Sequence, residues 1–153
     1  MSRGRPRKRV PLKYKHMRSR FEQHVAARLD ELGIPWEYEK YAFEYLKPIR
    51  SAVCEDCDSR KVAAKRQYTP DFYLPEYKVF LEVKGRFGQQ DRMKMRQVVE
   101  QVEGERFIMV FSRDNLIGRK ATTRTRYTEY ARNYGMGAMM FDELSDESIR
   151  RES

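Results

Sequence analysis

The sequence predicts an α/β protein in which helices flank a central mixed β-sheet. Three observations support this fold class. Segments with helical spacing of apolar residues alternate along the chain with short segments typical of strands. The chain has 153 residues, of which 40% are hydrophobic, enough for one domain with a substantial core. The sequence shows no internal repeat. We therefore expect one domain with elements in the order α-β-β-β-α-β-α-β.

The first predicted helix covers residues 19 to 32 and ends at the "GIP" of residues 33 to 35. Its apolar stripe has helical spacing and consists of Phe21, Val25, Leu29 and Leu32. The next segment, "WEYEKYAFEY" at 36 to 45, alternates large apolar and charged residues and predicts an amphipathic strand. A polar connection rich in Lys and Arg follows at 47 to 66.

The remaining elements follow from the same patterns. We expect, in order, a hairpin over 67 to 84, a helix over about 89 to 103, a buried strand over 106 to 111, a loop to about 123, a helix that ends at Gly135, and a short strand within 136 to 141. The last of these helices carries Tyr127, Tyr130 and Tyr134 on one face, which favours the core over a platform for stacked bases.

The net charge of +9 is concentrated at the N-terminus. Residues 1 to 20 contain no acid and nine bases, namely Arg3, Arg5, Arg7, Lys8, Arg9, Lys13, Lys15, Arg18 and Arg20. The other 23 of the 32 basic residues balance the 23 acidic residues. A basic arm on a neutral domain is typical of nucleic-acid binding, because each Lys or Arg that meets a phosphate releases counterions. The alternative is a tail that only increases solubility.

The charge distribution and the predicted elements together predict the domain organisation. We expect a flexible, basic DNA-binding arm over 1–17, a globular domain over 18–145 and a disordered tail over 146–153. A second basic cluster, Arg92, Lys94 and Arg96, lies on the helix predicted at 89 to 103, where it either contacts phosphates or forms a solvated face.

The sequence also indicates a cellular compartment. No stretch approaches the roughly 18 apolar residues of a membrane span, and no apolar signal-peptide segment follows the basic N-terminus. Two cysteines, Cys54 and Cys57, are too few and too close for a disulfide framework. We therefore expect a soluble, intracellular protein with no membrane partner. Cys54-x-x-Cys57 is also half of a structural Zn²⁺ site, which a second chain would complete, although free thiols in a loop are the simpler interpretation.

The stretch "YTPDFYLPEYKVFLEVKG" at 68 to 85 carries the chemistry. Alternate residues of a strand share a face, so Glu82 and Lys84 are neighbours. Asp71 joins them if it pairs with Glu82 across the hairpin, a register that leaves a short turn near Glu76. Two partly desolvated carboxylates at close range favour a hard divalent cation between them. A cross-strand salt bridge without function is the alternative explanation of Glu82-x-Lys84.

Glu22 supplies a third carboxylate near the apolar stripe of the first helix. The segment Ser19-Arg20-Phe21-Glu22 also has the spacing of a capping box, in which the glutamate bonds back to the backbone N–H of the cap. The residues alone leave both roles open, helix cap and catalytic carboxylate.

These motifs resemble a known family. Pro70-Asp71 followed by Glu82-Val83-Lys84 resembles the P-D…(D/E)-x-K nuclease superfamily. The stretches "SRFEQHVAARLDELGIPWEYE", "YTPDFYLP", "LEVKG", "DRMKMRQV" and "FIMVFS" are similar to the endonuclease I family of the T-odd phages, over roughly residues 18 to 141. The chain departs from that family in the connection with Cys54 and Cys57 and in a hairpin that is longer by one residue.

The resemblance implies a fold, an activity and partners. We expect a restriction-endonuclease-like sheet, an intertwined homodimer, and a metal-dependent, structure-selective endodeoxyribonuclease. Its substrate would be branched double-stranded DNA, with four-way (Holliday) junctions resolved by paired nicks. A phage-encoded enzyme of this kind would work in the cytoplasm of its bacterial host.

The resemblance also implies roles for the site residues. Asp71, Glu82 and the backbone carbonyl of Val83 would bind one Mg²⁺ or Mn²⁺, and Glu22 would help Asp71 to hold a second ion. Lys84 would orient or deprotonate the attacking water, or neutralise charge on the phosphorane. In an intertwined dimer, Glu22 would come from one subunit and the other residues from its partner.

Two other functions remain open at this point. One is a related nuclease with another target, such as a transposase-like end-cutting subunit, a mismatch-nicking enzyme or a restriction endonuclease. The other is a non-catalytic DNA-binding protein, in which the arm binds DNA and the carboxylates form ordinary salt bridges.

Overall fold

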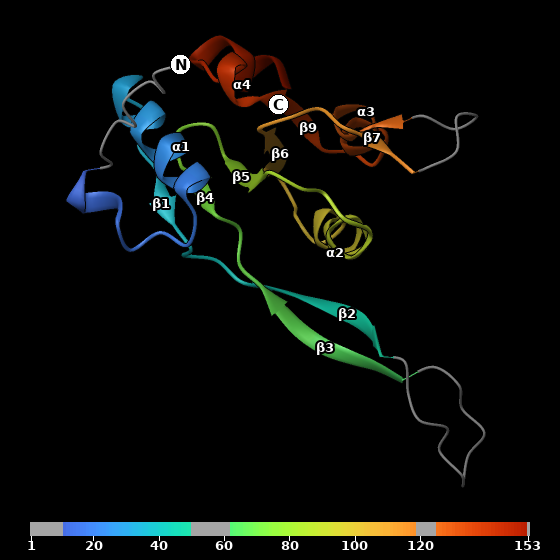
Figure 1. Cartoon of the computed structure of the whole chain (residues 1–153). Helices are drawn as coiled ribbons and strands as arrows, with labels where there is room; N and C mark the ends of the chain where they lie inside the picture. The colour runs from blue at the N-terminus through green and yellow to red at the C-terminus, as the bar shows by residue number, and fades with distance from the viewer. Residues whose placement is uncertain (1–10, 50–61, 119–124, 153) are drawn as a thin grey trace, which may run out of the picture.

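The fold is a five-stranded mixed β-sheet with helices on both faces (Figure 1). A computed structural model describes residues 11–49, 62–118 and 125–152. The strand order is β1-β4-β5-β6-β9, formed by Glu37–Tyr38, Phe72–Leu74, Val79–Lys84, Arg106–Phe111 and Gly137–Met140. Strands β1, β4 and β5 pair antiparallel, whereas β5, β6 and β9 pair parallel. The predicted class, a mixed sheet flanked by helices, is confirmed.

Helices cover the two faces of the sheet in pairs. On one face, α1 (Arg20–Glu31) and α4 (Asp146–Glu152) share a hydrophobic core with Leu81 and Val83 of β5. On the other face, α2 (Gln89–Val99) and α3 (Tyr127–Asn133) pack with Phe80. The alternation predicted for the 79–84 strand is therefore confirmed, and it places Glu82 and Lys84 on the α2 side. Within the described residues, no helix is long and apolar enough to cross a membrane.

The predicted hairpin register is also confirmed. Phe72 pairs with Leu81, and Leu74 pairs with Val79, which puts Asp71 opposite Glu82 at the open end of the hairpin. Residues 75 to 78 form the turn, and Lys78 adopts the left-handed region with φ 53°. This local geometry fixes the separation of the two carboxylates on the strands.

The single strand predicted at 36 to 45 is wrong, because the chain turns at Glu39, whose φ is 47°. The turn separates β1 from β2 (Phe43–Ile49), which pairs antiparallel with β3 (Val62–Tyr68). Much of the connection expected at 47 to 66 is therefore strand. Together β2 and β3 form a separate two-stranded sheet that projects away from the central sheet (Figure 1). We call it the β2–β3 arm, to distinguish it from the N-terminal basic arm.

The base of the β2–β3 arm is attached to α2 by side-chain amides. The Gln97 amide pairs with the backbone of Leu46, accepting from its N–H at 2.8 Å and donating to its carbonyl at 2.9 Å. Gln101, just beyond α2, donates to the carbonyl of Glu44 at 2.6 Å. Because these bonds replace missing strand partners along the edge of β2, they fix the arm relative to α2.

The C-terminal residues 146–152 form α4, so the disordered tail predicted over 146–153 is wrong. Ile149 is fully buried, and the Glu152 carboxylate accepts from Arg132 and from the backbone N–H of Ala138. Gly137 allows this close approach, since a Cβ there would lie 2.5 Å from the Glu152 carbonyl oxygen. The tail is ordered because it buries Ile149, for which the sequence pattern had predicted no place in the core.

The N-terminal boundary also differs from the prediction. Tyr14 of the short 3-10 helix η1 (Leu12–Tyr14) and the following Met17 are buried against the core. The globular domain therefore includes Tyr14 and Met17, which lie inside the predicted arm. The five bases of residues 3 to 9, like Cys54 and Cys57, lie outside the described residues.

Smaller differences concern the second half of the chain. Helix α2 ends at Val99, before the predicted boundary of 103, and the chain turns at Gly104 with φ 82°. The loop expected up to 123 contains β7 (Leu116–Ile117), which pairs with β8 (Thr125–Arg126). A 3-10 helix η2 (Phe141–Glu143) leads into α4. Of the tyrosine stripe, Tyr127 is buried as predicted, whereas Tyr134 is 41% exposed.

Candidate active site

The site is built around a buried pair of carboxylates. Asp71, at the start of β4, and Glu82, within β5, are 8% and 2% exposed. The Asp71 Oδ2 atom accepts a hydrogen bond of 2.8 Å from the backbone N–H of Val83. The Glu82 carboxylate accepts from the Tyr68 hydroxyl and lies 3.2 Å from the Lys84 ammonium. Both acids are therefore held by neighbours in addition to their strands.

Burial and mutual repulsion dominate the electrostatics of this pair. Burial, and then the negative charge of Glu82, raise the pKa of Asp71 to about 8. Burial acts to lower the pKa of Lys84, but the Glu82 and Asp91 carboxylates outweigh it and raise this pKa above its usual value. The pair thus carries one proton near neutral pH, and a cation that displaced this proton would relieve the repulsion.

Glu22 reaches the same site from α1 and also belongs to the helix cap. The Ser19 Oγ atom accepts from the Glu22 backbone N–H at 3.1 Å and donates to its carboxylate at 2.9 Å. The Tyr38 hydroxyl donates to the other carboxylate oxygen at 2.7 Å, and Glu22 is only 7% exposed. The Glu22 carboxylate thus contacts the hydroxyl of the cap residue, in place of the backbone N–H expected for a capping box, and Glu22 also lines the site.

The predicted site residues meet in one hollow of ≈ 370 Å³. It is lined by Arg18, Glu22, Tyr45, Gln67, Tyr68, Thr69, Asp71, Glu82, Val83, Lys84 and Lys94. The division of Glu22 from the other acids between two subunits, which the resemblance implies, stays a prediction.

Tyr68 and Asp91 were not assigned from the sequence, and Lys94 was named only in a basic cluster for which two roles were left open. Tyr68 binds Glu82, Asp91 lies 3.4 Å from the Lys84 ammonium, and Lys94 lines the hollow. The spacing of residues on the predicted helix could have separated Lys94 from Arg92 and Arg96. Residues 92 and 96 share one face of α2, whereas 94 lies on the opposite side, one turn after Asp91. The sequence pattern could not place Tyr68, because Thr69 and Pro70 follow it and interrupt the alternation of strand residues.

The donor set fits a divalent cation. Among the described residues, no three His, Cys, Asp or Glu side chains lie close enough together to form a ready metal cluster. Asp71 and Glu82 nevertheless provide two buried carboxylates that repel each other, with an ammonium beside them. Hard divalent ions prefer such oxygen ligands. Asp71 and Glu82 are thus the residues that could hold an ion, with Glu22 facing it across the hollow.

We expect the affinity for Mg²⁺ to rise by about 50-fold between pH 6 and pH 8, and by only about a further twofold at higher pH. The raised pKa of Asp71, about 8, means that below this pH a proton occupies the pair and must leave when an ion binds. Calorimetric titration of the protein with Mg²⁺ over this pH range measures the effect. An affinity that stays constant from pH 6 to pH 8 would contradict the shared proton.

The ordered basic residues of the predicted arm differ in their surroundings. Lys13 forms an ion pair with Asp30 at 2.7 Å and lies over the Tyr14 ring. Arg18 pairs with Glu39 while lining the hollow, and Lys15 and Arg20 are exposed. Of these four, Arg18 is the one placed at the site itself.

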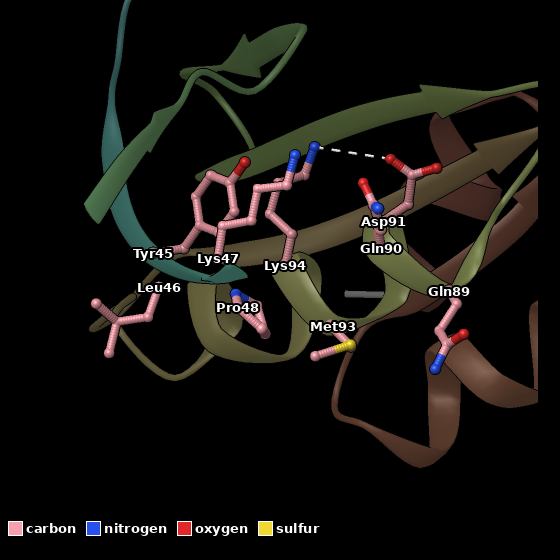
Figure 2. Close-up of a pocket in the computed structure, with 9 residues that line it drawn as sticks. All are labelled: Tyr45, Leu46, Lys47, Pro48, Gln89, Gln90, Asp91, Met93 and Lys94. Carbon is pink, nitrogen blue, oxygen red and sulfur yellow. Dashed lines mark ion pairs between the residues drawn. The ribbon is translucent and has the colours of Figure 1, made fainter. Parts of the chain in front are cut away.

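A second hollow of ≈ 670 Å³ adjoins the first, between the β2–β3 arm and α2 (Figure 2). The two hollows share Tyr45 and Lys94. Figure 2 shows the side chains of Lys47 and Lys94 projecting in the same direction from β2 and α2. The site therefore opens along α2 into a groove with basic residues on both walls.

Comparison with known proteins gives consistent matches. A sequence model of the family described as phage endonuclease I matches residues 4–144. Endonuclease I of Escherichia phage T7 is 31% identical over 119 residues, which cover 78% of this chain and 69% of the T7 protein. Endodeoxyribonuclease 1 of Enterobacteria phage T3 is 29% identical over 119 residues, covering 78% of this chain and 68% of the T3 protein.

Proposed function

This chain belongs to the phage endonuclease I family, and from that premise we propose that it cuts branched DNA and resolves four-way junctions by paired nicks. It is an endodeoxyribonuclease of a class that uses divalent metal ions. The proposed ion is Mg²⁺, which Mn²⁺ can replace. The observation that carries the proposal is the buried Asp71–Glu82 pair with Lys84 beside it, at the edge of a groove with basic walls.

The proposed mechanism assigns a task to each site residue. Asp71 and Glu82, with the Val83 carbonyl, would hold one ion, and Glu22 with Asp71 would hold a second. Such ions supply charge neutralisation at the phosphate and a more acidic attacking water. Lys84 is fixed between Glu82 and Asp91, so its ammonium can orient that water beside the carboxylate pair. Tyr68 and the Val83 N–H keep the two carboxylates in position.

A homodimer is part of the proposal, because a four-way junction must be cut on two strands related by an approximate two-fold axis. One chain carries one such site and would only nick. We also place the enzyme in the cytoplasm of a bacterial host, where phage recombination intermediates would be its substrates. A Zn²⁺ ion bound by Cys54 and Cys57 of two chains remains a weaker proposal.

The experiment that tests the function compares two DNA substrates of the same sequence. A labelled four-way junction and the corresponding linear duplexes are incubated with the protein and Mg²⁺, beside a control with Ca²⁺. We expect paired cuts in the junction and little cleavage of the duplexes. Equal cleavage of both would favour a nuclease with another target, and cleavage of neither would favour a non-catalytic DNA-binding protein.

The basic arm gives a separate prediction. Removal of residues 1–9 deletes five bases but leaves Tyr14 and Met17 in the core. We expect weaker junction binding and a salt dependence of log K whose slope is smaller by up to roughly four, since each lost phosphate contact contributes about 0.9. Binding titrations at several salt concentrations measure both. An unchanged slope would make the arm a passive tail.

A further inference from the structure

Lys94 extends from α2 into the site. Its side chain is 16% exposed, and its ammonium lies 4.5 Å from the centroid of the Tyr68 ring, whose hydroxyl binds Glu82. Contact with a ring face stabilises a cation without occupying its N–H donors in conventional hydrogen bonds. Since Lys94 lines both hollows, its ammonium stands where the catalytic site opens into the groove (Figure 2).

The two lysines of the site differ in what they already bind. The Lys84 ammonium lies 3.2 Å from Glu82 and 3.4 Å from Asp91, so carboxylates of the protein occupy its donors. Lys94 forms a longer ion pair with Asp91, whose carboxylate lies 3.8 Å from the Lys94 ammonium, beyond the range of a hydrogen bond. Lys94 is thus a half-buried lysine in the site whose ammonium has donors available for a substrate.

The charge balance of the hollow shows why a second ammonium matters. Glu22, Asp71 and Glu82 bring three carboxyl groups to the hollow, and Arg18 is already paired with Glu39. A phosphodiester adds another negative charge, which grows on its oxygens as the bond to the leaving group breaks. Donors placed at such a position act strongly in a site with little water.

We propose that Lys94 is a catalytic residue that donates a hydrogen bond to the phosphate being cleaved. The inference rests on the proposed nuclease function. In the reaction, a bond forms between the water oxygen and phosphorus, and the bond from phosphorus to the leaving sugar oxygen breaks. The attacking water releases a proton to bulk water, and the leaving sugar oxygen takes up a proton from bulk water. Lys94 stays protonated throughout and transfers no proton. It stabilises the charge of the transition state, whereas Lys84 orients the water.

The test substitutes Lys94 with methionine, which keeps the length of the apolar stem over Tyr68 and removes the charge. Arg96→Met is the matched control. It removes a positive charge from the same helix, where Arg96 lies over Tyr134 at 4.3 Å and outside both hollows. Single-turnover cleavage of a labelled junction with saturating enzyme and Mg²⁺ gives the rate of the chemical step. Junction affinity is measured separately with Ca²⁺, and thermal melting reports the fold.

We expect Lys94→Met to reduce the single-turnover rate by about 100-fold, as for the loss of one transition-state donor, while affinity and melting temperature stay close to wild type. Lys94→Arg should recover at least tenfold of that loss, and Arg96→Met should cleave normally. A Lys94→Met rate within threefold of wild type overturns the proposal. A loss explained by weaker junction binding or lower melting temperature, or not relieved by arginine, also overturns it. If the wild-type protein cleaves no DNA, the proposed function itself fails, so the two failures are distinguishable.

Discussion

Replacement of Glu82 by glutamine is expected to abolish cleavage, with a loss of at least about 10³-fold in rate, while junction binding stays within threefold of wild type. Glu82 is 2% exposed and lies at the centre of the site, between Tyr68 and Lys84. Glutamine has nearly the same shape, so the core remains filled, but it lacks the charge that is proposed to hold an ion and that pairs with Lys84. Binding depends on phosphate contacts elsewhere and should persist.

The two effects are separated by measuring single-turnover cleavage with Mg²⁺ and junction affinity with Ca²⁺. Glu100→Gln provides a control, because Glu100 is an exposed carboxylate at the end of α2. It should cleave at the wild-type rate. If Glu82→Gln lost binding and cleavage together, a folding defect would be indicated. Cleavage close to the wild-type rate would remove Glu82 from the catalytic assignment.

The second large effect concerns heterodimers. A dimer of one wild-type chain and one chain with both Glu22→Gln and Glu82→Gln should nick one strand of a junction at nearly the wild-type rate per site. This prediction takes each site to be built from one chain, in which Glu22, Asp71, Glu82 and Lys84 line one hollow. If α1 were exchanged between subunits, each site would contain one substitution, and the same heterodimer would be inactive.

The reciprocal mixture completes this experiment. A heterodimer of a Glu22→Gln chain and a Glu82→Gln chain should be inactive, because each chain then carries one defect in its own site. Differently tagged chains are unfolded and refolded together, and heterodimers are purified by both tags. Strand-specific end labels then distinguish a nick from a paired cut. Activity of the reciprocal mixture together with an inactive first heterodimer would establish an exchanged, intertwined dimer.

Local sequence patterns were sufficient to predict the centre of the site. Strand alternation gave the faces of Glu82 and Lys84, and the hairpin register that places Asp71 opposite Glu82 is observed. This succeeded because turn length and alternation fix a hairpin within a few residues. The apolar stripe of α1 likewise predicted the contact of Val25 and Leu29 with the core.

Features that depend on distant contacts could not be predicted in the same way. The break at Glu39, which separates β1 from the β2–β3 arm, requires a left-handed backbone conformation that glutamate does not favour. Helix α4 is short, and its order depends on contacts with β9, including the approach permitted by Gly137. Lys94 enters the site only because α2 packs beside β2, the partner strand of β3, and thereby lies over Tyr68 at the end of β3.

The Asp71–Glu82 pair has a consequence for handling the protein. The pKa of Asp71 is raised from 3.8 to about 8, so the folded chain holds a proton that the unfolded chain releases at much lower pH. Stability associated with that proton is fully present below the usual carboxyl range and is lost as the pH rises through 8. An ion that binds only the folded chain compensates for this loss. If the pair holds the proposed ion, chelators used to keep a nuclease silent during purification also remove a support of its fold, most of all in alkaline buffer.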